Sequence, residues 1–479
     1  MTTLCDATLA GLPARVSVPA YDRRALVPSV VHLGVGGFHR AHQALYLDDL
    51  AALGETGWGV VGVGLRSTEM GEVLQAQDGL FTVVERGPEG ETARVVGSLL
   101  AYHYAPDDPE AVLALLAAPQ TRLVTLTITG DGYRAEPEEA LRDLPRTAMG
   151  YLVQGLARRR AADLGPFTVL SCDNLPDSGK AARDAVLEQA RAADPDLADW
   201  IAEHGRFPSS MVDRITPETS PADRDAVERE WGVPDRWPVI AEPFRQWVVQ
   251  DDFACGRPPL ERVGVRLVDD VEPYKLVKTR VLNAGHSAIG YLGALAGHTT
   301  SYEAMADPVI AEALRTMVLH EVLPLLHAPD DLDLEDYVET TLTRFANPAV
   351  ADTLARLCRR GSVKMPSYLL PSLREAREQG RPSGLLVLAT AAWMRALRGT
   401  DLAGRPLPVE DPKAEALQAL ALAGGDDPRP LLGARSVFGR LGDDPALVAD
   451  LEAALRTLST DGLALAAKRA ADGDLAVAA

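Results

Sequence analysis

The sequence predicts an α/β protein in which a Rossmann-type doubly wound sheet is followed by a mostly α-helical domain. Between residues 28 and 172, short apolar runs rich in β-branched residues alternate with helical stretches, as in a parallel sheet covered by helices. After about residue 275 the chain is rich in Leu and Ala with helical periodicity, and strand patterns are nearly absent. We therefore expect one domain over residues 1–275 and a second over residues 276–479.

The sheet of the first domain is predicted to begin within residues 28–50, where an apolar run, a Gly-rich turn and a helical stretch follow one another. Further strands are predicted at 58–65, 122–129 and 167–172, because each is a short run of β-branched and apolar residues. Helices are predicted at 109–117 and 150–162. Ligands of such sheets lie beyond the carboxyl ends of the strands, so polar residues that follow these strands are candidates for a site.

The second domain is predicted to be an assembly of helices. Helical periodicity extends over residues 307–327, 331–345, 348–359, 367–378, 382–398 and onward to 470. No internal repeat is visible, and the Ala/Gly-rich residues 472–479 are expected to fray.

Composition and charge exclude several classes of protein. The 479 residues carry a formal net charge of -20, which disfavours nucleic acid or an anionic membrane as a partner. No uncharged apolar run reaches the roughly 18 to 20 residues of a membrane span, and the N-terminus lacks the apolar core of a signal peptide. The four cysteines are far apart and form no C-x2-C pair, so neither a zinc knuckle nor a disulfide framework is indicated. We expect a cytoplasmic protein that holds no metal.

A Gly-rich turn follows the first predicted strand, at Gly34, Gly36, Gly37 and Phe38. Such glycines let backbone N–H groups approach a pyrophosphate at a helix N-terminus. The match to G-x-G-x-x-G is imperfect because His39 occupies the third Gly position, and an ordinary tight turn fits the pattern as well as a dinucleotide site does. Arg40 and the nearby imidazoles are expected to contact phosphate and to pack, since no carboxylate or Cys accompanies them at ligand spacing.

The residues just after the second predicted strand are expected to determine whether the protein binds NAD or NADP. An acid there accepts a hydrogen bond from the ribose 2′-OH of NAD, whereas an Arg accommodates the 2′-phosphate of NADP. The chain has both Arg66 and Glu69 at this place, so NAD is expected and NADP is not excluded.

Asp173 and Asn174 follow the last strand predicted in the sheet. An Asn beyond a strand end can donate to an oxygen on which negative charge develops. The other interpretation is a turn or helix-capping residue, which Asx side chains often are.

Lys278, Asn283 and His286 form the pattern K-x4-N-x2-H within an apolar stretch. On a regular α-helix they lie at roughly 0°, 140° and 80° around the axis, on one side, with Ala284 and Gly285 leaving room for a ligand. A Lys in an apolar pocket has a lowered pKa and can act as a general base. A surface Lys beside an ordinary core His fits the spacing equally well.

Two further patterns are rejected. Tyr274 and Lys278 have the Y-x3-K spacing of short-chain dehydrogenases, but the TGxxxGxG turn of that class is absent. His320 and Glu321 begin like a zincin helix, but Pro324 stands where the second His is needed.

Seven segments, taken in order, resemble the mannitol dehydrogenase family of long-chain polyol dehydrogenases, and the resemblance covers nearly the whole chain. The segments are HLGVGGFHRAHQA (32–44), WGVVGVGLRS (58–67), LTIT (126–129), SCDNLP (171–176), MVDRITP (211–217), K-x4-N-x2-H (278–286) and RFANPAV…GSVKMP (344–366).

The resemblance implies a zinc-independent oxidation of a linear polyol to a ketose with NAD, most simply D-mannitol to D-fructose. It implies that Lys278 is the general acid/base and that Asn174 and Asn283 stabilise the reacting oxygen. It also implies substrate binding by these residues: His286, Asp213, Arg356 and Lys364. Because long-chain members of the family often function without assembly, we expect a monomer.

The chain departs from the family pattern at three places. Gly130 and Asp131 stand where family members often carry a Glu after LTIT, and Thr68-Glu69 replaces an acidic pair. Lys275 occupies the position of a Glu that helps to pass protons to solvent in family members. The sequence therefore does not indicate the route by which protons reach solvent in this chain.

Two alternatives remain. A relative that acts on a sugar acid, such as fructuronate reductase, would need an extra cation, which Lys275, Arg356 or Lys364 could provide. A non-catalytic NAD-binding sensor would keep the Gly-rich turn, but would not need the Lys, the two Asn and the His.

Overall fold

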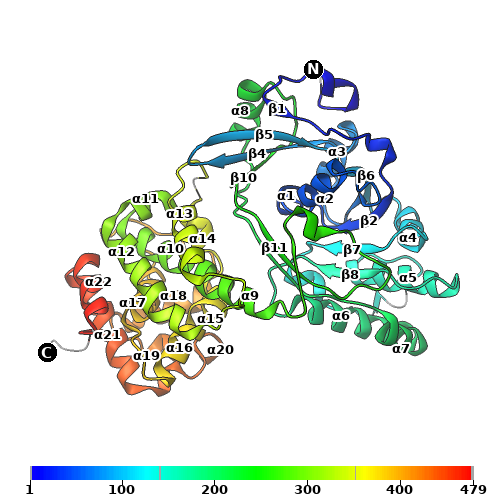
Figure 1. The fold of residues 1–479 in the computed structure, drawn as a ribbon. Helices are drawn as coiled ribbons and strands as arrows, with labels where there is room; N and C mark the ends of the chain where they lie inside the picture. Colours follow the sequence, from blue (N-terminus) through cyan, green and yellow to red (C-terminus); the bar gives the residue numbers. More distant parts are fainter. Residues whose placement is uncertain (1–2, 137, 140–141, 351, 476–479) are drawn as a thin grey trace. The chain divides into compact units, whose positions relative to one another are not determined.

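The computed structural model describes residues 3–136, 138–139, 142–350 and 352–475. By internal contacts the chain divides into two compact units, Met1–Glu272 and Pro273–Ala479. Figure 1 shows all the labelled strands in the blue-to-green first unit, whereas the second unit is drawn in helices up to the red C-terminal end. None of the described helices combines the length and the apolar composition of a membrane span.

A parallel sheet of five strands forms the centre of the first unit, in the order β6-β3-β2-β7-β8. Its strands are β2 (Pro28–Leu33), β3 (Gly59–Gly64), β6 (Leu99–Tyr104), β7 (Leu123–Leu126) and β8 (Thr168–Ser171). The predicted strands are therefore confirmed, except that β7 ends three residues earlier than expected. Strand order reverses between β2 and β7, and this switch point is where ligands of such sheets bind.

Strand β2 shows why this sequence forms a central strand. Val30 packs into one core cluster with helix α2, while Val31 and Leu33 pack into another with helix α5. Successive side chains of a strand point to opposite faces, so a continuous apolar run suits a strand that is buried on both sides. The sheet is thus fixed from both faces, and its carboxyl end is held rigidly.

The helices of the first unit cover the sheet and connect its strands (Figure 1). They are α1 (Gly37–Ala41), α2 (Gln43–Ala52), α3 (Glu69–Ala76), α4 (Pro109–Ala117), α5 (Ala148–Ala161), α6 (Ser178–Ala193), α7 (Pro195–His204) and α8 (Pro221–Ala226). The predicted helices at 109–117 and 150–162 correspond to α4 and α5.

Two smaller sheets of the first unit were not predicted from the sequence. One has the order β1-β5-β4-β10 and the other β12-β11-β9. Their strands are β1 (Val16–Ser17), β4 (Phe81–Gly87), β5 (Gly90–Val96), β9 (Ser210–Asp213), β10 (Val239–Ala241), β11 (Gln246–Gln250) and β12 (Arg266–Val268). Most of these strands are short and pair with partners far away in the sequence, so their pairing leaves little local pattern.

The second unit is built around helix α10 (Ala284–Ala296), which is buried on almost every side and contacts α11, α12, α14, α15 and α17. The described helices are α9 (Glu272–Lys278), α11 (Ser301–Ala306), α12 (Pro308–Thr316), α13 (Leu334–Phe345), α14 (Leu354–Cys358), α15 (Gly361–Tyr368), α16 (Leu370–Glu378), α17 (Gly384–Ala396), α18 (Ala414–Gly424), α19 (Arg429–Leu432), α20 (Arg435–Phe438), α21 (Pro445–Thr460) and α22 (Leu463–Asp472).

Two predicted helices of this unit are partly wrong. Of the described residues in the range 348–359, which leave out residue 351, only Leu354–Cys358 is helical, and Thr353 caps this helix through its side chain. The range 307–327 begins as α12, widens into a π-helical turn at Met317–Val322 and ends in a 3-10 turn at Leu323–Leu325. Pro324 lacks the N–H that would continue the α-helical ladder.

Candidate active site

The Gly-rich turn after β2 places Gly34 in the left-handed region, with φ +94°. A methyl group there would lie 2.3 Å from the main-chain oxygen of Thr127, so only Gly allows β2 and the end of β7 to approach this closely. A methyl group on Gly37 would meet no atom within 4 Å, and one on Gly36 would meet a single atom at 3.8 Å. The outer face of the turn is therefore open to a ligand.

A cavity of about 360 Å³ lies at the carboxyl ends of β2, β3 and β7, at the switch point of the sheet. Gly34, Thr127 and Thr129 belong to its wall, and Arg66 and Ser67 belong to its rim after β3. Glu69 is not among the described residues that line it; it is the exposed first residue of α3. The cavity lies where the sequence predicts a dinucleotide, and the role of Glu69 at the ribose stays a prediction.

The residues after the turn pack inward. His39, at the third Gly position, stacks on His32 of β2 with ring centroids 3.4 Å apart. Phe38 stacks on His42 with centroids 5.0 Å apart. The phosphate contact expected for Arg40 is wrong, because its guanidinium is buried and donates to the main-chain oxygen of Trp237. A glycine at the third position of the motif would leave space between the helix and the strand. His39 fills this space instead, by stacking on His32 of β2.

Asn174 and Asp213 lie at the ends of strands in the first unit. Asn174 is exposed, three residues beyond the end of β8, and helix α6 is capped by Asp177 rather than by Asn174. Asp213 is the last residue of β9 and is only 3% exposed. Each of the two residues interacts with other groups of the protein.

Lys278 and Asn283 are joined by an irregular helical segment. Lys278 ends α9, Thr279–Asn283 forms a π-helical turn, and α10 begins at Ala284. The regular α-helix assumed for the angular positions is therefore wrong. A π turn inserts a residue into the helix and rotates the residues after it, a distortion frequently found at functional sites. Lys278 is 7% exposed and Asn283 is 8% exposed, so a surface lysine is excluded.

His286 lies in a cationic environment. Burial lowers the pKa of His286 well below its usual value, and the charges of Arg356, Arg344, Lys364 and Lys278 lower this pKa further. The imidazole is therefore neutral and offers one donor and one acceptor. Its ring contacts Phe345, with centroids 4.2 Å apart.

The room expected beside Gly285 is filled by protein. A methyl group at Gly285 would lie 3.0 Å from Cε2 of Phe345, so the glycine admits this ring and not a ligand. The expectation that Gly285 leaves space for substrate is wrong, and its role is to let α13 pack close to α10.

Two buried polar atoms near Lys278 lack hydrogen-bond partners. They are Nδ2 of Asn283 and Nε2 of His286, each without a partner among the residues that the structure describes. Burying a polar group without a partner costs about 1–3 kcal/mol, so folded proteins rarely keep one without a reason. A hydroxyl-bearing ligand would satisfy both atoms.

Arg356 is positioned by close packing of α14 on α10. A methyl group at Gly293 would lie 2.7 Å from Cδ1 of Leu354, so glycine at this position lets the helices approach. The Arg356 guanidinium makes a bidentate pair with Asp352, one turn earlier, with Nε 2.6 Å from Oδ1. This pair fixes the plane of the guanidinium.

Lys364 lies on α15 and donates from Nζ to the main-chain oxygens of Arg356 (3.2 Å) and Leu357 (3.0 Å). Burial lowers the pKa of Lys364 to about 8, and the neighbouring Arg356 charge contributes. Two of its three N–H groups thus close the C-terminal end of α14, which leaves one for a ligand.

The two rejected patterns have structural roles. The Tyr274 hydroxyl donates to Oδ1 of Asp331 over 2.5 Å. Glu321 is buried and accepts from the main-chain N–H groups of Leu385 and Leu386 at the start of α17. Among the described residues, no group of three or more His, Cys, Asp and Glu side chains could hold a metal ion.

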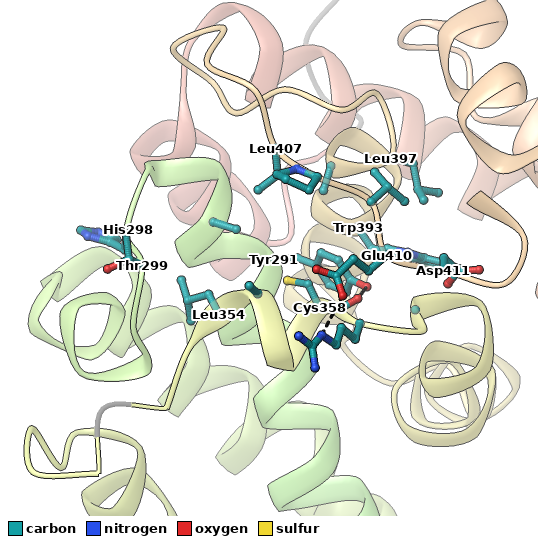
Figure 2. Close-up of a pocket in the computed structure, with 17 residues that line it drawn as sticks. Tyr291, His298, Thr299, Leu354, Cys358, Trp393, Leu397, Leu407, Glu410 and Asp411 are labelled. Atoms are coloured by element: carbon teal, nitrogen blue, oxygen red, sulfur yellow. Dashed lines mark hydrogen bonds and ion pairs between the residues drawn. The ribbon is translucent and has the colours of Figure 1, made fainter. Parts of the chain in front are cut away.

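A second cavity of about 220 Å³ lies within the helical unit, between α10, α14, α17 and the segment 407–411. Figure 2 shows Tyr291, Cys358 and Glu410 close together at one end and His298 and Thr299 at the other. None of the site residues predicted from the sequence lines it. Burial raises the pKa of the Cys358 thiol to about 12, so this thiol is not reactive near neutral pH.

Sequence reasoning missed several residues of the site. Arg344 is buried, and its charge helps to lower the pKa of His286, while Asp352 orients Arg356. Tyr133 was also missed, and its hydroxyl donates to Asp173 beyond the end of β8. Arg344 is the first residue of RFANPAV, a segment that carries the family resemblance, so that segment was the signal that could have found it.

Comparisons with known proteins match most of the length of both units. The family model described as the mannitol dehydrogenase Rossmann domain matches residues 28–262, and that of the mannitol dehydrogenase C-terminal domain matches residues 270–459. Mannitol 2-dehydrogenase of Phaeosphaeria nodorum is 45% identical, covering 93% of this chain and 82% of the relative. Mannitol 2-dehydrogenase of Aspergillus fumigatus is 42% identical, covering 94% of each.

Two solved structures of polyol dehydrogenases are similar to this chain over nearly its whole length. Mannitol 2-dehydrogenase of Pseudomonas fluorescens, in a ternary complex with NAD and D-mannitol, is 38% identical with a TM-score of 0.88, covering 98% of this chain and 99% of that one. A D-sorbitol dehydrogenase in substrate-free form is 36% identical with a TM-score of 0.89, covering 97% and 100%. This chain belongs to the mannitol dehydrogenase family.

Proposed function

We propose that this protein oxidises D-mannitol to D-fructose with NAD and catalyses the reverse reduction, with Lys278 as the general acid/base and without zinc. The observation that carries the proposal is the pair of buried, unsatisfied atoms on Asn283 and His286 near Lys278. A polyol offers hydroxyls that both donate and accept, which is what these atoms lack. The relatives named mannitol 2-dehydrogenase and the neighbour solved with NAD and D-mannitol support the same substrate and cofactor.

The proposed chemistry is a proton transfer coupled to a hydride transfer. Bound NAD supplies the acceptor of the hydride. The free amine of Lys278 takes the proton from the hydroxyl of the reacting carbon, and its ammonium form returns the proton during reduction. The amide of Asn283 donates to the same oxygen as negative charge builds on it, and Asn174 is proposed as a second donor.

The remaining hydroxyls need partners of their own. The neutral His286 can donate to one hydroxyl or accept from it, which an imidazolium could not do. Arg356 and Lys364 are proposed to donate to hydroxyls farther from the reacting carbon, and Asp213 is proposed to accept from one. Because Asp352 holds the guanidinium of Arg356 in place, little side-chain entropy is lost when substrate binds.

A sugar acid such as fructuronate is the second candidate substrate. It is favoured by the four cationic side chains whose charges act on His286, because a carboxylate would be attracted to them. The carboxylate of Asp352 already neutralises Arg356, and burial lowers the pKa of Lys364, so the net attraction is smaller than four charges imply.

A substrate panel separates these candidates. Purified protein is assayed through nicotinamide absorbance with D-mannitol, D-sorbitol and D-fructose, and with fructuronate, each with the NAD and the NADP forms. Higher kcat/KM for mannitol and fructose than for fructuronate supports the proposal, and the opposite order replaces it with the sugar acid. Cofactor binding without turnover of any substrate would indicate a sensor.

We also propose that the protein acts as a cytoplasmic monomer. The four cysteines are free thiols, which suits a reducing compartment. Size-exclusion chromatography with light scattering measures the mass directly, and a value of twice 51.2 kDa would contradict the monomer.

A further inference from the structure

The carboxylate of Asp173 joins the ends of two adjacent strands of the central sheet. It follows β8 and accepts hydrogen bonds from main-chain N–H groups beyond the end of β7, from Ile128 to Oδ2 (2.9 Å) and from Thr129 to Oδ1 (3.0 Å). These two N–H groups lie beyond the β7 ladder, where the strand has ended at Leu126. The carboxylate accepts the hydrogen bonds that a neighbouring strand would accept within a sheet. Because it is charged, these bonds are stronger than those to a neutral acceptor.

Tyr133 completes the arrangement. Its hydroxyl donates to Oδ2 of Asp173 over 2.7 Å and lies 2.6 Å from Oγ of Ser171. Because the tyrosine proton is given to the carboxylate, Ser171 is the donor in the second bond. Burial raises the pKa of the Asp173 carboxyl and also that of the Tyr133 hydroxyl, and the three hydrogen bonds oppose the effect on Asp173.

The backbone held in this way is strained. Thr129 has φ +65° and ψ 164°, a conformation that residues with a side chain rarely adopt. Such residues persist only where the surroundings enforce them, and they cluster at functional sites. Here the enforcing contact is the bond from the N–H of Thr129 to Asp173.

The strained segment forms part of the wall of the proposed dinucleotide cavity. Thr127, Ile128 and Thr129 all line it, and the main-chain oxygen of Thr127 abuts Gly34 of the Gly-rich turn. The neighbouring groups are held by bonds from the Thr127 N–H to Leu33 and from the Gly132 N–H to Thr129. Asp173 is the acceptor for the N–H groups of Ile128 and Thr129, so without the carboxylate these two groups would lose their hydrogen bonds and this part of the wall would be less firmly held.

We propose that Asp173, supported by Tyr133, is a positioning residue of the cofactor site, which holds residues 127–129 in the shape that the dinucleotide requires. Neither side chain needs to touch the cofactor for this role. The inference rests on the proposed use of this cavity for NAD, and not on the identity of the polyol. A second consequence is that the main chain leading into Asn174 is fixed at the residue just before it.

The test compares three variants by the dissociation constant of NADH, measured by fluorescence without any polyol. Asp173→Asn keeps the shape but turns an N–H group toward a backbone N–H, so NADH should bind about tenfold more weakly. Tyr133→Phe removes the hydrogen bond to Asp173 and the one from Ser171, but leaves the carboxylate with its two main-chain donors, so NADH binding should weaken about threefold. Tyr151→Phe is the matched control, since it removes a buried hydroxyl that donates to Ala105 in the same unit but away from the cavity wall.

Steady-state kinetics add a second readout, in which KM for NAD rises in Asp173→Asn more than KM for mannitol does. A purely structural role would lower the melting temperature of both Asp173→Asn and Tyr133→Phe while NADH affinity stays at the wild-type value, and this result overturns the proposal. If Asp173→Asn does not fold, Tyr133→Phe decides by the same measurement. Wild-type protein that binds NADH but oxidises no mannitol would refute the proposed function and leave this affinity test intact.

Discussion

Lys364 donates a hydrogen bond from Nζ to the main-chain oxygen of Arg356 over 3.2 Å, so the two cations proposed to hold the substrate are connected to each other. The ammonium also lies against the C-terminal carbonyls of α14, where a positive charge is favourable. The position of Lys364 on α15 therefore depends on the helix that carries Arg356. Loss of the positive charge of Lys364 should therefore weaken substrate binding and raise KM for the substrate.

The first prediction concerns pH. Since the pKa of Lys364 is lowered to about 8, KM for mannitol should rise by about tenfold per pH unit above pH 8 as the charge is lost. In Lys364→Met, KM should be high at every pH, while the pH dependence of kcat persists. A wild-type KM that stays constant from pH 7 to pH 9.5 would show that Lys364 does not bind substrate as a cation.

The same group affects stability with a defined sign. The unfolded chain keeps the lysine proton up to its usual pKa of 10.5, whereas the folded protein releases it near pH 8. Between these values the unfolded state binds more protons, so the contribution of Lys364 to the free energy of unfolding increases with pH. Urea unfolding of wild type and Lys364→Met at pH 7 and pH 9.5 measures the difference.

The second prediction concerns Lys278. Lys278→Ala should lower kcat by about 10²- to 10⁴-fold, because general acid/base catalysis contributes that much. NADH affinity should remain, since the lysine is on the helical unit and does not line the dinucleotide cavity. Lys275→Ala is the comparison, because it removes a second buried lysine from the same helix. Equal loss in both variants would mean that packing of α9, and not proton transfer, is responsible.

The third prediction concerns the unsatisfied amide of Asn283. Asn283→Leu keeps the side-chain shape and removes a buried donor without a partner, so the free energy of unfolding should increase by about 1 kcal/mol. At the same time kcat should fall by about 10²- to 10³-fold, as when a donor to a developing oxyanion is lost. Ser287→Ala, one turn later on α10, should be slightly destabilised and keep its activity. Loss of both stability and activity in Asn283→Leu would show that the amide stabilises the folded protein, and would contradict its role as a free donor to substrate.

The fourth prediction concerns cofactor choice. Glu69→Lys should shift the ratio of kcat/KM values toward NADP, because it removes a repulsive charge near Arg66 and Ser67 at the cavity rim. Glu72→Lys, which makes the same charge change one turn along α3, should leave the ratio unaltered. An unchanged ratio in both variants would mean that the ribose site is misplaced.

The fifth prediction concerns the turn that precedes Lys364. In Gly361→Ala the methyl group would lie 2.3 Å from Oη of Tyr291 and 2.7 Å from Nε1 of Trp393, both of which line the cavity in Figure 2. Overpacking of this kind costs about 1–3 kcal/mol and should displace the start of α15. The melting temperature should fall and KM for mannitol should rise. Gly165→Ala, where the methyl group meets nothing within 4 Å, should change neither quantity.

Periodicity was sufficient to predict four of the five strands of the central sheet and most of the helices, but not β6. Strands β2, β3, β7 and β8 were found because each is a short apolar run with both faces buried, a signal contained in the strand itself. The strands β4 and β5 were missed although they pair over seven residues, since nothing in either run alone indicates its partner. The tight turn after β2 was also predicted from its glycines, and Gly34 there has the left-handed φ that favours glycine.

The sequence by itself determined the two-domain order, the Gly-rich turn and the spacing of Lys278, Asn283 and His286, because these depend on neighbours within a few residues. Only the tertiary structure decided that a π-helical turn separates Lys278 from Asn283, that Phe345 occupies the space beside Gly285, and that the amide of Asn283 is buried without a partner. Phe345, for example, lies on α13, far from Gly285 along the chain. The burial, the electrostatic environment and the hydrogen bonds of a residue depend on all residues around it in space. The sequence alone shows only the residues that are adjacent along the chain.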